Sequence, residues 1–178
     1  MSRDPFVIRR ARTGDVAAIK ELVEPLVQRR ILLGKETVVF YEAVQEFRVA
    51  ETPSGELIGC GALHVMWSDL GEVRTLAVAH DWLRKGVGHA LLERLESDAL
   101  QLGLSRLFCL TFELEFFQRN GFEDMGDVTV DPELYSELLR SPDEGVAEFL
   151  DLARVKPNTL GNTRMIKHLD QHAPLNTP

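Results

Sequence analysis

The sequence has little cysteine, since Cys60 and Cys109 are the only two among 178 residues. Each lies inside an apolar run, so we expect two buried free thiols and neither a disulfide framework nor a zinc site. Long apolar runs are also absent, which excludes the ~20-residue segment that a membrane-spanning helix needs. The first 30 residues lack the apolar block of a signal peptide. We therefore expect a cytoplasmic protein.

Positive charge is scarce as well. Lys and Arg total 20 against 28 Asp and Glu, which gives a formal net charge of -8. Nucleic acids and anionic membranes attract clustered basic residues, so neither is an expected partner. Apolar residues make up 44% and charged residues 27%, a balance that excludes disordered, collagen-like and coiled-coil classes. The length suits one domain.

Hydrophobic periodicity gives the expected order of elements. Strands are predicted at 6–10, 47–50, 57–67, 73–79, 107–112 and 163–169, and helices at 16–30, 36–44, 86–102, 113–120 and 132–140. An antiparallel meander that leads into a β-α-β unit predicts an α+β fold. Its central sheet is mixed and mostly antiparallel, with flanking helices. We expect a single domain over 1–169 and a disordered tail at 170–178.

The most informative segment is 76–92. A strand ends, a short loop follows, and Gly86 and Gly88 open a long amphipathic helix. Glycines let the backbone approach an anion, and the free N–H groups and dipole of a helix N-terminus hold phosphate. Arg84 and Lys85 add positive charge. Neither the GxGxxG nor the GK[ST] pattern is present. The alternative is a helix start that merely contains two glycines.

This segment resembles the GNAT superfamily of N-acetyltransferases, in which a strand ending Leu-Ala-Val is followed, seven residues later, by GxG at a helix start. The second signature of that superfamily, FYxxxGF, is similar to 116–122, and the resemblance covers roughly 6–125. It implies the GNAT fold and acetyl-CoA as cosubstrate, with the pyrophosphate on the loop amides. The expected coenzyme A contacts are Leu76, Ala77, Val78, Arg84, Lys85, Gly86, Val87, Gly88 and His89.

Two positions depart from that pattern. Leu83 stands where the superfamily carries Gln or Arg, and Arg84 with Lys85 is the expected substitute. Phe117 stands where many members carry a tyrosine that protonates the leaving thiolate. A thiol pKa of ~8.5 makes thiolate a tolerable leaving group, so water can serve. Thr111, at the end of the neighbouring strand, is a second candidate donor to the sulfur, although threonine is also common in strands for its β-propensity.

Further short sequence segments resemble one subfamily, the acetyltransferase domain of N-acetylglutamate synthase. The resemblance is to its short, stand-alone form found in actinobacteria. The short sequence segments that carry this second resemblance are 31–33, 58–63, 71–74, 104–108, 110–111, 117–122 and 162–164. The resemblance covers about 25–169. It implies transfer of an acetyl group to the α-amine of L-glutamate, the first step of arginine biosynthesis. L-glutamine as substrate and a homodimer stay open. The alternatives are a GNAT that acetylates another small amine or a protein N-terminus, and a non-catalytic acyl-CoA-binding regulator.

Glu72 is the expected general base, because the attacking amine must lose a proton. It lies four residues before Leu76, which predicts that both side chains share one face of the strand, near the cofactor. The resemblance also points to Glu72, acting through water; the alternative is a solvated glutamate. Backbone N–H groups at Ala77 and Val78 are expected to polarise the thioester carbonyl.

A dicarboxylate substrate requires cations. Lys35 lies where the synthases carry a substrate-binding arginine, and Arg74 lies two residues after Glu72, hence on the same side. Thr163 or Arg164 is expected to reach the second carboxylate from the last strand, although a surface charge is an equal alternative for Arg164. No metal is expected, because His64, His80 and His89 have no ligand partner at suitable spacing.

Overall fold

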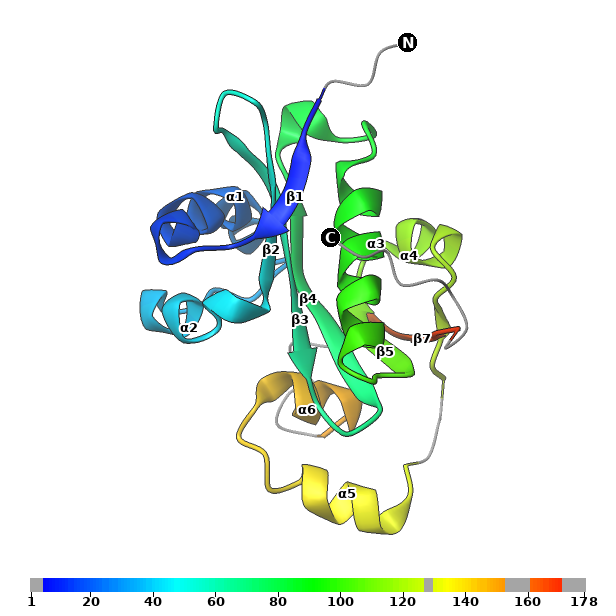
Figure 1. The fold of residues 1–178 in the computed structure, drawn as a ribbon. Helices are drawn as coiled ribbons and strands as arrows, with labels where there is room; N and C mark the ends of the chain where they lie inside the picture. Colours follow the sequence, from blue (N-terminus) through cyan, green and yellow to red (C-terminus); the bar gives the residue numbers. More distant parts are fainter. Residues whose placement is uncertain (1–4, 127–129, 153–160, 171–178) are drawn as a thin grey trace.

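The computed structural model describes residues 5–126, 130–152 and 161–170. Within these residues, seven strands form one sheet in the order β1-β2-β3-β4-β5-β7-β6 (Figure 1), and among their pairings only that of β4 with β5 is parallel. The strands are β1 Val7–Arg10, β2 Phe47–Glu51, β3 Leu57–Val65, β4 Leu70–Val78, β5 Arg106–Thr111, β6 Glu123–Asp124 and β7 Thr163–His168. This confirms the predicted α+β fold with a mixed, mostly antiparallel sheet. Of the predicted tail, 171–178 lies outside the described residues.

Helices cover both faces of the sheet. They are α1 Val16–Gln28, α2 Thr37–Glu42, α3 Val87–Gln101, α4 Leu114–Arg119, α5 Pro132–Leu138 and α6 Glu144–Phe149, with 3-10 turns at Thr13–Asp15, Val44–Glu46 and His80–Trp82. Figure 1 shows α1 and α2 on one side and α3 and α4 on the other. Val16, Ile19 and Val23 bury the apolar side of α1 against β2 and β3, and α3 packs Leu92 and Leu95 into the core of the opposite face.

Helix α6 was not predicted, and it lies at the lower end of β3 and β4 (Figure 1). Val146 and Phe149 pack against Leu70 of β4 and Phe108 of β5. The rings of Phe108 and Phe149 meet edge to face, with centroids 5.3 Å apart. Within the described ranges, no helix combines the length and apolar composition needed to cross a membrane. Cys60 and Cys109 are buried free thiols, as predicted.

A β-bulge interrupts β4. Cys60 pairs with Ala77 and Ala62 with Arg74, so two residues of β4, Thr75 and Leu76, oppose Gly61 alone. Thr75 has a φ of 56°, a left-handed conformation that accommodates the extra residue. One inserted residue reverses the alternation of side chains between the faces.

The predicted shared face of Glu72 and Leu76 is therefore wrong. Leu76 packs with the α3 side of the core, whereas Ala77 packs with α1 on the opposite face. Because the bulge lies between them, it is Ala77, and not Leu76, that follows Glu72 on the same face.

Strands β4 and β5 part from each other after a short contact. Leu70 to Glu72 pairs with Arg106 to Phe108, and then β4 continues to Val78 and β5 to Thr111 without pairing between them. The Ala79 N–H donates to the Ile58 carbonyl at 2.8 Å, so alternation turns the N–H and C=O of Val78 away from β3. The gap between β4 and β5 is therefore lined by backbone donors and acceptors of β4.

Candidate active site

The loop that follows β4 ends in the open N-terminus of α3. Arg84 and Gly86 adopt left-handed backbone conformations, with φ values of 62° and 88°, and α3 begins at Val87 without a side-chain cap. The first N–H that bonds into the helix belongs to Ala90, which donates to the Gly86 carbonyl at 3.0 Å. In the described part of the chain, the N–H groups of residues 86–89 have no protein acceptor. These donors and the helix dipole form a site suited to phosphate.

Two side chains of this loop make contacts with neighbouring groups. His89 Nδ1 lies 2.6 Å from Asn120 Oδ1, so its ring is directed toward the end of α4. Lys85 Nζ lies 4.9 Å from the centre of the Trp82 ring, a cation–π contact. A Cβ at Gly88 would lie 3.3 Å from Phe116 Cε2. Gly88 therefore allows β4, α3 and α4 to approach closely beside the free amides.

We predict that Gly88→Val weakens binding of acetyl-CoA at least 10-fold. Two γ-methyl groups would occupy the space that backbone amides need to reach a pyrophosphate, and they would press on Phe116. Isothermal calorimetry with acetyl-CoA measures the change. Gly14→Val is the matched control, because a Cβ at Gly14 meets nothing within 4 Å. Unchanged affinity in a folded Gly88→Val protein would contradict the assignment.

Glu72 and Arg74 form a buried ion pair on one side of β4, as predicted from their spacing. Arg74 Nε donates to Glu72 Oε2 at 2.9 Å, and Nη2 donates to the same oxygen. Both bonds end on Oε2, so Oε1 takes no part in the pair. Glu72 is only 5% exposed. Burial raises the pKa of Glu72, and Arg74 offsets only part of that rise. A carboxylate of this kind is a stronger base than one in water.

Asp143, the N-cap residue of α6, binds Arg74 from the other side. Arg74 Nη1 donates to Asp143 Oδ2 at 3.2 Å and Nη2 to Oδ1 at 2.9 Å. Asp143 Oδ1 also accepts the Val146 N–H at 3.1 Å, which starts the helix. Burial raises the pKa of Asp143, but the bonds from Arg74 outweigh this and hold it below its usual value. Asp143 therefore couples the start of α6 to the ion pair.

Lys35 lies close to this pair although it comes from the connection between α1 and α2. Burial and the positive charge of Arg74 lower the pKa of Lys35, while Glu72 and Asp143 raise it in part. The fold thus brings together Lys35, Glu72 and Arg74, three residues that the sequence analysis selected for one site. Their catalytic and binding roles remain predictions.

Comparison with known proteins identifies the family. Residues 21–122, more than half of the chain, match the Acetyltransferase (GNAT) family. The chain belongs to this family. An amino-acid acetyltransferase of Mycobacterium tuberculosis is 56% identical over 162 residues, which are 90% of this chain and 92% of that protein.

Solved structures agree with the family assignment. The crystal structure of Rv2747 from Mycobacterium tuberculosis in complex with CoA and NLQ has a TM-score of 0.88 at 55% identity, over 92% of this chain and 99% of that one. N-acetylglutamate synthase from Neisseria gonorrhoeae, complexed with coenzyme A and N-acetyl-glutamate, has a TM-score of 0.74 at 26% identity. That match covers 95% of this chain and 36% of the synthase, so this chain spans little more than a third of it. The GNAT fold over a single domain is thereby confirmed.

In this GNAT chain, Phe117 is a packing residue. It is 5% exposed, and its ring lies edge to face with Phe116 and Phe122, at 5.1 Å between centroids in each pair. Thr111, also buried, accepts the Glu113 N–H at 2.8 Å through its hydroxyl oxygen. That bond leaves the hydroxyl proton for a second acceptor. The arrangement is compatible with Thr111 as the donor to a leaving sulfur.

The last strand of the sheet carries Thr163 and Arg164, the two residues expected to reach the second substrate carboxylate. Thr163 pairs with Thr111 across the ladder between β5 and β7. Arg164 donates to the carbonyl of Phe149, at the end of α6, at 2.6 Å and to the carbonyl of Gly126 at 2.9 Å. Arg164 therefore holds α6 in place through backbone groups. Contact of Arg164 with a substrate carboxylate stays a prediction.

Sequence reasoning missed several charged residues near the ion pair. His64 Nδ1 lies 2.7 Å from Glu46 Oε1, and its Nε2 lies 3.7 Å from Asp143 Oδ2. Sequence spacing indicated no such partners, because they come from distant segments. Asp143 and Glu148 were missed together with α6, although Ser-Pro-Asp before it is a helix-start signal. Among the described residues, no group of three or more His, Cys, Asp or Glu is arranged to hold a metal.

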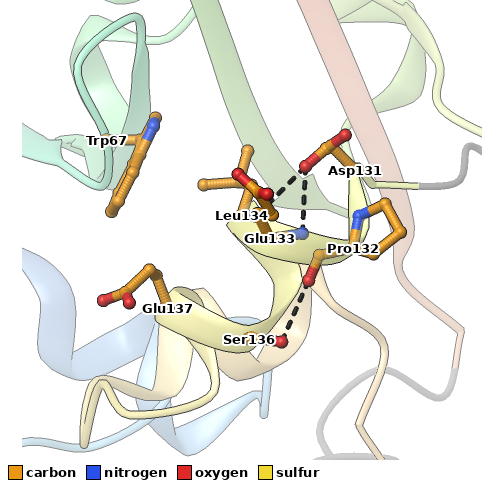
Figure 2. Close-up of a pocket in the computed structure, with 7 residues that line it drawn as sticks. All are labelled: Trp67, Asp131, Pro132, Glu133, Leu134, Ser136 and Glu137. Atoms are coloured by element: carbon orange, nitrogen blue, oxygen red, sulfur yellow. Dashed lines mark hydrogen bonds between the residues drawn. The ribbon is translucent and has the colours of Figure 1, made fainter.

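A separate hollow of about 680 Å³ lies between Trp67 and α5 (Figure 2). Its lining is acidic and comprises Trp67, Asp131, Pro132, Glu133, Leu134, Ser136 and Glu137. Asp131 caps α5 by accepting the N–H groups of Glu133 and Leu134. A dicarboxylate would be repelled by three carboxylates. The lining of this hollow includes no Lys or Arg to offset that repulsion, whereas the cluster around Arg74 also includes Lys35, so the hollow does not suit an acidic amino acid.

Proposed function

We propose that this GNAT transfers the acetyl group of acetyl-CoA to the α-amine of L-glutamate, giving N-acetyl-L-glutamate. The observation that carries the proposal is the meeting of Lys35, Glu72 and Arg74 beside the gap between β4 and β5. A base and two cations are what an α-amino dicarboxylate requires. The 56% identity to an amino-acid acetyltransferase supports this class of reaction. So does a structural neighbour that holds coenzyme A and N-acetyl-glutamate.

The proposed reaction follows from where each group lies. The free amides of residues 86–89 hold the pyrophosphate of acetyl-CoA. The N–H of Val78, which is directed into the gap, polarises the thioester carbonyl. Oε1 of Glu72 takes a proton from the α-ammonium, directly or through water, and the amine lone pair attacks the carbonyl carbon. The C–S bond then breaks, and the nitrogen releases its second proton, which water carries to the departing thiolate. Thr111 can donate a hydrogen bond to that sulfur.

Arg74 and Lys35 bind the substrate carboxylates in this scheme. Glu72 and Asp143 engage every N–H of Arg74 except one on Nη1. Among the described residues of this cluster, that remaining donor and the Lys35 ammonium are the positively charged groups available to an incoming carboxylate. Their local charge is needed because the whole chain carries -8.

One assay distinguishes the proposed function from three alternatives: L-glutamine as substrate, another amine as substrate, and a non-catalytic regulator that binds acyl-CoA. Release of coenzyme A is measured with L-glutamate, L-glutamine, other amino acids and peptides with free N-termini. Turnover of L-glutamate supports the proposal, and preference for L-glutamine changes the substrate but not the class. Turnover of other amines alone, or acetyl-CoA binding without turnover, contradicts the proposal. The cytoplasmic location and the homodimer remain predictions.

We predict that Lys35→Met and Arg74→Met each raise the KM for L-glutamate. A charge-assisted hydrogen bond is worth ~1.5–3 kcal/mol, so the expected rise is roughly 10- to 100-fold. The KM for acetyl-CoA should hardly change, because the phosphates lie on the α3 loop. Steady-state kinetics with each substrate varied separately tests this. Arg119→Met is the control, since Arg119 forms only an exposed ion pair. Normal KM values for L-glutamate in both variants would show that Lys35 and Arg74 do not bind the substrate carboxylates.

A further inference from the structure

Glu148 is a buried carboxylate that the proposed reaction does not use. It lies on α6 and is 7% exposed. Within the described part of the chain its side chain has no hydrogen bond and no ion pair. Burying a charge without a partner is costly, so a mostly buried, unpaired carboxylate either takes up a proton or is suited to a cationic group that arrives from outside the chain.

The position of Glu148 on α6 places it beside the ion pair. Gly145, three residues earlier, lies on the same side of the helix. A Cβ at Gly145 would overlap Glu72 Oε2 and would lie 2.7 Å from Arg74 Nη2. The side of α6 that carries Gly145 and Glu148 therefore rests directly on Glu72 and Arg74. Val146 and Phe149, on another side, fix the helix in the core.

The charges around Glu148 are mostly negative. Burial raises its pKa to about 7, and the carboxylates of Glu72, Glu144 and Asp143 add to the rise. Arg74 is the cation that opposes the rise, and it is already bound to Glu72 and Asp143. Among the residues that the structure describes, no cation is therefore paired with Glu148 alone.

We propose that Glu148 binds the α-ammonium group of the substrate, beside Glu72, and thereby selects ligands that carry this ammonium. The inference rests on the proposed function. An ammonium has several N–H donors, so it can donate to Glu148 and to Oε1 of Glu72 at once. Glu72 removes one proton, and Glu148 keeps the amine oriented. The carboxylates of the substrate remain with Lys35 and Arg74.

Glu148→Gln tests the proposal, because it preserves size and removes the charge. We expect the KM for L-glutamate to rise roughly 10- to 100-fold. Glutarate, which has the two carboxylates but no ammonium, is used as a competitive inhibitor. Its Ki should stay unchanged or fall, since a negative charge has been removed. The matched control is Glu123→Gln, where the side chain is exposed; it should change neither constant more than about twofold.

Thermal unfolding provides a second readout. The raised pKa means that the free protein loses stability as pH rises from about 4.5 to about 7, because Glu148 ionises in the unfolded chain at a lower pH than in the fold. Glu148→Gln should therefore unfold at a higher temperature than the wild type at pH 8, and at a similar temperature at pH 5. This comparison also shows that the variant folds.

The outcomes separate this inference from the proposed function. A glutarate Ki that rises together with the glutamate KM indicates a structural role and overturns the inference. An unchanged glutamate KM in Glu148→Gln overturns it as well, while wild-type turnover of L-glutamate leaves the proposed function standing. A wild-type protein that acetylates no α-amino acid contradicts the proposed function itself, and the role of Glu148 with it.

Discussion

Replacing Glu72 by glutamine is expected to lower kcat for L-glutamate by ~10²–10⁴-fold, the usual contribution of a general base. Glutamine preserves the size of the side chain and an oxygen that can accept from Arg74. It cannot take a proton. Since the ammonium form of the substrate has no lone pair to attack the thioester, turnover should then depend on the small fraction of free amine. We therefore expect the residual rate to rise with pH in proportion to that fraction.

The measurement is steady-state release of coenzyme A across pH, together with acetyl-CoA affinity by calorimetry. Affinity should be unchanged, because Glu72 lies at the paired end of β4 and the phosphate site at its far end. Glu123→Gln serves as a control on the same sheet, where the glutamate is exposed. Near-normal kcat with a wild-type pH profile would exclude Glu72 as the base.

The local structure of the proposed phosphate site was predictable because its information is local. A strand end, two glycines and an amphipathic helix follow one another within 76–92, and each signal depends on neighbouring residues only. The structure places them as expected, with left-handed Gly86 before α3 and unbonded amides after it. The placement of Glu72 and Arg74 on one side of β4 was also predictable, since residues two positions apart in a regular strand share a face.

Other parts of the site depend on contacts between distant segments. The bulge at Thr75 reverses the alternation of β4 after Arg74, and periodicity counts residues without detecting an inserted one. Helix α6 has only six residues and contains glycine, so it has too few turns for a hydrophobic period to appear. Asp143 and Glu148 reach the site because Val146 and Phe149 dock α6 over Phe108. No local pattern encodes that docking.

Gly145 makes α6 difficult to predict from the sequence, and it also allows the helix to contact the ion pair of Glu72 and Arg74. Gly145 has ordinary helical backbone, so conformational freedom does not explain it. An alanine there would favour an isolated helix by roughly 1 kcal/mol. A steric clash opposes this gain in helix propensity, because the added Cβ would overlap Glu72 Oε2 and crowd Arg74 Nη2. Glu72 and Arg74 must then separate or α6 must move away.

We therefore predict that Gly145→Ala destabilises the protein although it raises helix propensity. Breaking a buried ion pair costs ~3–5 kcal/mol, so the net loss of unfolding free energy should be roughly 2–4 kcal/mol. The same displacement moves the base and the carboxylate-binding cation together, and kcat/KM for L-glutamate should fall at least 100-fold. Chemical denaturation and steady-state kinetics measure the two effects. Gly14→Ala, where the added Cβ meets nothing within 4 Å, should leave both nearly unchanged. A Gly145→Ala protein as stable and as active as the wild type would show that α6 does not rest on Glu72 and Arg74.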